Sequence, residues 1–124
     1  MNKEKLNELY LKNGLTKEDV FEHKFYKIIS RSGIDKIQAK NKIYINYDLI
    51  HNSPDNKCII IKATAKHGDQ TIQTFGESSP SNTTNSYPVA MAEKRAMSRA
   101  VLKLTGFYEL GHFGEDEAED FKRK

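Results

Sequence analysis

The feature that most limits the fold is a stretch of the sequence, residues 87–105, that reads as one long amphipathic helix. Pro88 stands in the first turn, where a missing N–H does no harm, and Gly106 can end the helix in the left-handed conformation. Three alanines, spaced four residues apart, share one face: Ala92, Ala96 and Ala100. Such small side chains predict a helix that packs very close to a sheet.

Three segments before this helix predict the strands of that sheet. Residues 43–50 alternate apolar and polar side chains, and residues 57–66 and 70–76 are rich in β-branched residues. Short turns between them favour an antiparallel meander. Residues 77–86 are polar and without periodicity, so we expect an exposed loop.

The N-terminal part predicts two short helices, at residues 2–12 and 16–23, and a β-rich segment at residues 25–30. The fold class is therefore α+β, a three-stranded antiparallel β-meander packed against one long C-terminal helix, with short N-terminal helices. With 124 residues we expect one domain, residues 1–112, followed by an acidic and flexible tail, residues 113–124.

The charge is unevenly distributed along the chain. Residues 25–112 carry twelve Lys or Arg against seven Asp or Glu, whereas residues 113–124 carry three basic and five acidic residues. A basic body suits a polyanionic partner, although an excess of this size is also enough to keep a small protein soluble. A low apolar content for this length favours self-association.

The helix carries a stripe of cations on a second face. Arg95, Arg99 and Lys103 lie four residues apart, with Lys94 beside them. Like charges at this spacing oppose the helix by roughly 0.2–0.5 kcal/mol per pair, which predicts an anionic counter-charge. Phosphate is the favoured interpretation because the planar guanidinium binds it bidentately. The alternative is that Glu93 or another carboxylate of the chain neutralises the stripe, or that the stripe is a solvated face.

Other residues could extend the same surface. Aromatic rings can stack on unpaired bases; Tyr47 and Phe75 fit a strand core better, and Tyr44 and Tyr87 are the stacking candidates. The further basic candidates lie on or beside the predicted strands: Arg31, Lys36, Lys40, Lys42, Lys62 and Lys66.

Nothing in the sequence predicts an enzyme, a cofactor or a metal site. The four histidines are dispersed, and no phosphate-binding loop or nucleophile motif is present. Asp48, Glu77 and Glu93 lack the spacing of a nuclease site. A single cysteine, Cys58, and the lack of an apolar segment long enough for a membrane favour the cytoplasm.

The segment from residue 70 to residue 107 resembles the single-strand annealing proteins of phage recombination, of the Erf and Sak type, and their ring-forming eukaryotic Rad-type relative. The likeness rests on a strand that ends in Phe75-Gly76-Glu77, a loop with Ser78-Ser79-Pro80, and a helix that contains Ala92-Glu93-Lys94-Arg95-Ala96, Arg99-Ala100 and Leu102 and is followed by Gly106-Phe107. Upstream, Ile29-Ser30-Arg31-Ser32-Gly33-Ile34 precedes the strands in the expected order.

The resemblance implies a protein, encoded by a phage and acting in the host cytoplasm, that binds and anneals single-stranded DNA in recombination or replication. It implies a homo-oligomer, a ring or filament, with Arg95, Arg99 and Lys103 lining a basic groove. Two alternatives stay open, a module that binds double-stranded RNA and an adaptor whose basic helix binds an acidic protein. The acidic tail could compete for the groove or recruit a recombination or replication partner, or simply be solvated.

Overall fold

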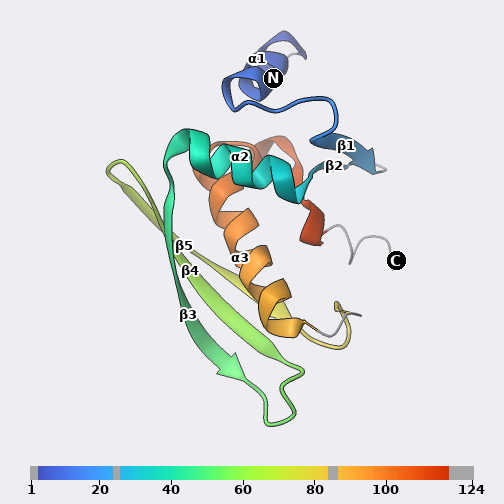
Figure 1. Cartoon of the computed structure of the whole chain (residues 1–124), viewed down its shortest axis with the longest axis vertical. Coiled ribbons are helices and arrows are strands. Elements are labelled where there is room, and N and C mark those ends of the chain that lie inside the picture. Colours follow the sequence, from blue (N-terminus) through green and yellow to red (C-terminus); the bar gives the residue numbers. More distant parts are fainter. Residues whose placement is uncertain (1–2, 24–25, 84–86, 118–124) are drawn as a thin grey trace.

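The computed structural model describes residues 3–23, 26–83 and 87–117, which form two three-stranded sheets, three α-helices of ten or more residues and two hydrophobic clusters (Figure 1). The predicted α+β class is confirmed. In chain order the elements are α1 Lys3–Lys12, β1 Val20–His23, β2 Tyr26–Ile29, α2 Arg31–Asn41, β3 Tyr44–Asn52, β4 Ile59–His67, β5 Gln70–Ser78, α3 Pro88–Leu104, the 3-10 helix η1 Tyr108–Leu110 and β6 His112–Gly114.

The larger sheet is the predicted antiparallel meander, in the order β3-β4-β5. Gly68, with a φ of +62°, allows the tight turn between β4 and β5. Along β4 the buried side chains alternate with less buried ones, and the buried set is Ile59, Ile61, Ala63 and Ala65. One face of this sheet therefore packs against helix α3 and the other faces away from it.

Helix α3 lies very close to β5, as the alanine stripe predicts. Ala92, Ala96 and Ala100 are completely buried. A Cβ at Gly76 of β5 would overlap the backbone of Ala92 and lie 2.5 Å from the nitrogen of Ala96, so only glycine fits there. The buried Thr74 hydroxyl donates a hydrogen bond to the Ala96 carbonyl oxygen at 2.7 Å.

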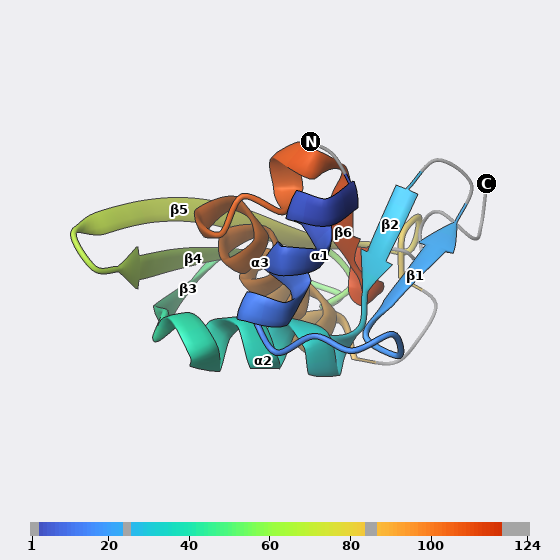
Figure 2. The ribbon, with the colours of Figure 1, turned by 90° about the horizontal axis from the view of Figure 1, so that it is seen from above.

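A second sheet, in the order β1-β2-β6, lies toward the C-terminal end of α3 (Figures 1 and 2). The helix expected over residues 16–23 is wrong. The Thr16 amide donates to Asp19 at 2.9 Å, a contact typical of a helix N-terminus, but the chain then enters β1 at Val20. The β-branched and aromatic Val20 and Phe21 pair with Ile29 and Ile28, and this pairing overrides the local helical signal.

The acidic tail is also corrected for its described part, residues 113–117; residues 118–124 lie outside the described residues. Phe113 and Gly114 belong to β6 and pair in parallel with β2. A Cβ at Gly114 would meet the Ser98 side chain at 2.7 Å, so β6 also packs tightly on α3. Asp116 is 2% exposed. The acidic residues that directly follow β6 are thus packed against the domain.

Helix α1 is attached to this end of the molecule through a buried aromatic cluster. The Tyr10 hydroxyl lies 2.7 Å from Nε2 of His112, and its ring stacks on Phe107 with 6.0 Å between centroids. His112 is fully buried, and burial, together with the charge of Lys27, lowers its pKa to about 4. The imidazole is therefore neutral at pH 7.

Candidate nucleic-acid interface

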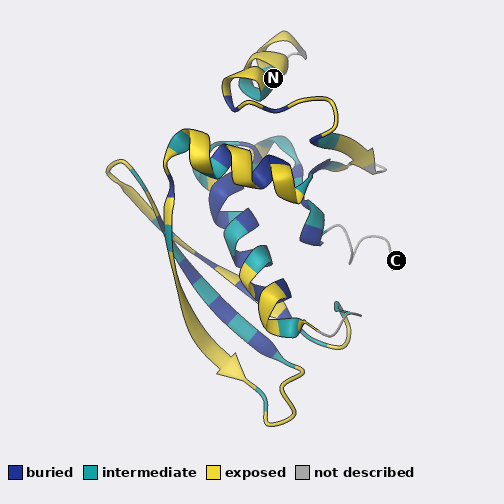
Figure 3. Cartoon of the chain, viewed as in Figure 1, coloured by how far each residue is buried: buried dark blue, intermediate teal, exposed yellow. Residues whose placement is uncertain are grey.

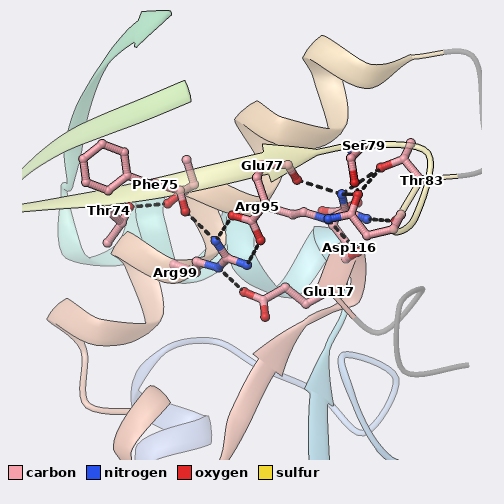
Figure 4. A network of polar contacts seen from close by, with 11 residues as sticks. Thr74, Phe75, Glu77, Ser79, Thr83, Arg95, Arg99, Asp116 and Glu117 are labelled. Atoms are coloured by element: carbon pink, nitrogen blue, oxygen red, sulfur yellow. Dashed lines mark hydrogen bonds and ion pairs between the residues drawn. The ribbon is translucent and has the colours of Figure 1, made fainter. Parts of the chain in front are cut away.

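Arg95, expected to be exposed, is 2% exposed, and its guanidinium is surrounded by hydrogen-bond acceptors of the chain (Figure 4). Nη1 donates to the Glu77 carbonyl oxygen at 3.0 Å and to the Thr83 hydroxyl at 2.9 Å, and Nη2 donates to the Asn82 carbonyl oxygen at 2.7 Å. Nε donates to the Asp116 carbonyl oxygen at 3.3 Å. Residues 79–83, expected to form an exposed loop, fold back over this side chain. Arg95 is thus a structural residue and is no longer a candidate for phosphate binding.

Arg99 has its counter-charges within the chain. Its Nη1 and Nη2 donate to the two carboxylate oxygens of Glu77 at 2.7 and 2.9 Å, and its Nε donates to Glu117 at 2.7 Å (Figure 4). The hydrogen bonds from Arg99 hold the pKa of Glu77 below its usual value, although burial acts in the opposite direction. For Arg99 the counter-charge therefore comes from carboxylates of the chain itself, as in the alternative interpretation of the stripe, and these carboxylates are distant in sequence.

Two more predicted cations are engaged in ion pairs. Nε of Arg31 lies 2.8 Å from a carboxylate oxygen of the buried Asp116. Nζ of Lys36 lies 2.7 Å from a carboxylate oxygen of Asp19. We call Arg31, Arg95 and Arg99 the arginine cluster, because segment 115–117 contacts all three.

Several of the predicted site residues lie together on the sheet face that points away from α3, although they are far apart in the sequence. Strand register places Tyr44 opposite Lys66, and Lys62 opposite Phe75. Tyr44 is 74% exposed and Phe75 is 49% exposed. The core position expected for Phe75 is therefore wrong. The small Thr74 and Gly76 take the side of β5 that faces the helix, so alternation turns Phe75 outward.

A polar row separates these two pairs on the same face. Asn46, Thr64 and Gln73 lie side by side on β3, β4 and β5. We call this surface the open face; its residues are Tyr44, Asn46, Asp48, Lys62, Thr64, Lys66, Thr71, Gln73 and Phe75. It combines exposed aromatic rings, two cations and amide groups, which are the groups that recognise unpaired bases and phosphates. Asp48 is acidic and lies opposite Lys62, whereas Glu77, two residues after Phe75 on β5, is bonded to Arg99.

The remaining candidates lie on the other side of the sheet. Tyr47 is opposite Ala63 and so faces α3, but it is still 38% exposed instead of forming core. Tyr87 precedes α3 and is 65% exposed, at the opposite end of the sheet from Tyr44. Lys94 is half-buried, and exposed Lys103 lies 5.1 Å from the centre of the Tyr108 ring. Lys40 and Lys42, near the end of α2, are exposed.

The described residues hold no group of three or more His, Cys, Asp or Glu side chains that could bind a metal ion. None of the described helices is both long and apolar enough to cross a membrane. No protein-family model, curated protein or solved structure matches this chain. The geometry of the open face is therefore the main guide to function.

Proposed function

We propose that this chain is a non-enzymatic protein that binds single-stranded DNA, and that the strand lies on the open face of the β3-β4-β5 sheet. The observation that carries the proposal is the register that places exposed Tyr44 and Phe75 on one face with Lys62 and Lys66 between them. The site expected on the cationic stripe of α3 is thereby moved to the opposite side of the sheet.

The spacing of the rings suits an extended strand. Tyr44 and Phe75 lie on the two outer strands, which places them roughly 10 Å apart across the sheet, and four residues apart in register, which adds about 13 Å along it. Each ring can stack on one base, and Lys62 and Lys66 on the central strand can contact the phosphates between them. A duplex presents its bases already stacked and paired, so rings on a sheet favour an unpaired strand.

The resemblance to phage single-strand annealing proteins supports DNA as the ligand, and with it roles in annealing, in a homo-oligomer, and in phage recombination or replication. The duplex RNA alternative would use cations of α3, of which Lys94 and Lys103 have no carboxylate partner among the ion pairs of the described residues. The two sets of lysines therefore separate the two functions.

The test is equilibrium binding of labelled single-stranded DNA, duplex DNA and duplex RNA across a salt series, with three variants. Removal of both rings in Tyr44→Ala/Phe75→Ala should weaken single-strand binding at least tenfold, since each stacked base contributes about 1–3 kcal/mol. Lys62→Gln/Lys66→Gln should reduce the slope of log K against log salt by about 1.4, at about 0.7 per phosphate contact.

The matched control is Lys94→Gln/Lys103→Gln, which removes the same charge from the helix side. This variant should leave unchanged both the affinity for single-stranded DNA and the slope of log K against log salt. A preference for duplex RNA that is lost in this control would support the RNA alternative. No salt-dependent binding of any of the three nucleic acids would reject both and leave the adaptor.

A further inference from the structure

The two edge strands of the β3-β4-β5 sheet, β5 and β3, differ in what contacts their outward backbone groups. On β5 the outward carbonyl oxygens of Phe75 and Glu77 accept hydrogen bonds from Arg99 and Arg95, so this edge is occupied by guanidinium groups. Strand β3, the other edge, pairs with β4 alone among the described residues. From Tyr44 to Leu49 it contains one charged residue, Asp48, and no Lys or Pro that would discourage another strand. The β3 edge is open to strand addition.

An apolar strip accompanies this open edge on the α3 side of the sheet. Tyr47 and Leu49 face that side, opposite Ala63 and Ile61. Helix α3 packs on β5 and β4, so it leaves Leu49 61% exposed, and β3 is coloured as exposed along most of its length in Figure 3. We call Tyr47 and Leu49 the β3 flank.

The charges beside the β3 flank are acidic. Burial raises the pKa of Tyr47 to about 12, and the carboxylates of Glu93 on α3 and Asp35 on α2 contribute to this rise. Both carboxylates are exposed, and neither has an ion-pair partner among the described residues. The surface beside the open edge thus combines apolar side chains with two unneutralised carboxylates.

We propose that β3 accepts an extended segment of a partner protein as a fourth strand, with apolar side chains on the β3 flank and a Lys or Arg facing Glu93 and Asp35. Backbone hydrogen bonds to the free edge supply affinity, and the apolar and cationic positions supply selectivity. A second copy of β3 fits less well. Its side chains on this side are Ile45, Tyr47 and Leu49, which would leave the carboxylates without a counter-charge. This site lies on the opposite side of the sheet from the proposed DNA surface and does not depend on it.

The probe is the capped peptide Thr-Val-Thr-Val-Thr-Lys-Thr, which places two valines and one lysine on one side of a strand. Its labelled form is titrated with the protein by fluorescence anisotropy, and amide hydrogen exchange is followed in the complex. We expect saturable binding, with added protection of residues 44–49 of β3 and none at β5. Glu93→Gln should weaken binding roughly two- to fivefold, the range of an exposed ion pair. Glu109→Gln, which removes an exposed carboxylate in η1, is the matched control and should bind like the wild type.

Several results would overturn this inference. If the peptide with Glu in place of Lys binds equally well, the carboxylates of Glu93 and Asp35 do not select a cation. If the peptide does not bind at protein concentrations up to millimolar, β3 does not accept a strand. Protection of β3 that rises with protein concentration without peptide would assign the edge to a second copy instead. The variant Lys62→Gln/Lys66→Gln, whose residues lie on the central strand β4 and not on β3, should bind the peptide normally, so failure of the DNA proposal and failure of this one are distinguishable.

Discussion

The arginine cluster and the open face use cations in opposite ways. Arg95 and Arg99 of α3 donate to carbonyls, a hydroxyl and carboxylates of three segments, which are β5, residues 82–83 and residues 115–117, and so join these segments to the helix. Lys62 and Lys66 stand on the central strand of a face that no described helix covers. The planar guanidinium with its five donors suits an internal junction, whereas the ammonium group of lysine retains its hydration at the surface. Cations that share one helix face are therefore not by themselves a ligand site.

Arg95 is expected to give the largest effect, because its replacement leaves several buried acceptors without a donor. We expect Arg95→Met to lower the free energy of unfolding by about 3–5 kcal/mol. Urea denaturation at pH 7 measures this, with Lys94→Met on the same helix as the control, expected within about 0.5 kcal/mol of the wild type. A loss below 1 kcal/mol for Arg95→Met would show that the cluster is not a structural junction.

His112, at the junction between α1 and β6, should make the free energy of unfolding sensitive to acid. An unfolded imidazole has a pKa near 6.5, whereas that of folded His112 is about 4. Between these values the unfolded chain binds the extra proton, so stability is full above about pH 6.5 and falls as the pH drops toward 4. The loss amounts to at most about 3 kcal/mol.

Urea denaturation of the wild type and of His112→Gln between pH 7 and 4.5 tests this expectation. Over this range the variant should lose less stability than the wild type, although Tyr10 loses a partner in it at every pH. Parallel curves for the two proteins would contradict the assignment to His112.

Arg99 is expected to have a smaller effect than Arg95, because its side chain is 22% exposed and Glu77 is 48% exposed. We expect Arg99→Gln to lower the free energy of unfolding by about 1 kcal/mol. The same variant should raise the pKa of Glu77, which nuclear magnetic resonance titration of that carboxylate measures. An unchanged pKa would mean that the ion pair does not form in solution.

The lysines of the open face are expected to give the smallest effect on stability. Lys62→Gln/Lys66→Gln should stay within about 0.5 kcal/mol of the wild type in urea denaturation, because neither ammonium has a partner among the hydrogen bonds and ion pairs of the described residues. A loss comparable to that of Arg99→Gln would mean that the lysines of the open face stabilise the fold as much as the arginine cluster does.

The long helix and the meander could be predicted because their signals are local. The alanine spacing of α3 and the alternation along β3 and β4 follow directly from the periods of a helix and a strand. The complete burial of Ala92, Ala96 and Ala100 confirms which face of α3 meets the sheet.

The environment of the arginines could not be predicted because it depends on contacts distant in sequence. Periodicity tells which residues share a helix face, but not that residues 79–83 and 115–117 return to cover Arg95. The parallel pairing of β6 with β2 likewise joins segments more than 80 residues apart. One signal was available for Arg99: Glu77 lies near the end of the strand that the alanine stripe packs against, at a place where its carboxylate can meet a cation of α3.

The outward position of Phe75 could have been found from the sequence. Thr74, Gly76 and Ser78 form an alternating set of small residues, which matches the small residues of α3 and implies that the helix packs on them. Phe75 must then lie on the other face. Hydrophobicity alone predicts a core position for Phe75, which is wrong. The helix packs so close to β5 that only small side chains fit between them, whether or not they are apolar.

The most direct test of the central claim is a nuclear magnetic resonance titration of the protein with a short oligodeoxythymidine. If single-stranded DNA lies on the open face, the amide and side-chain signals of Tyr44, Lys62, Lys66 and Phe75 should shift together and saturate at one affinity. Signals of Lys94, Arg95 and Lys103 should stay in place. Shifts confined to α3, with the open face unchanged, would contradict the account.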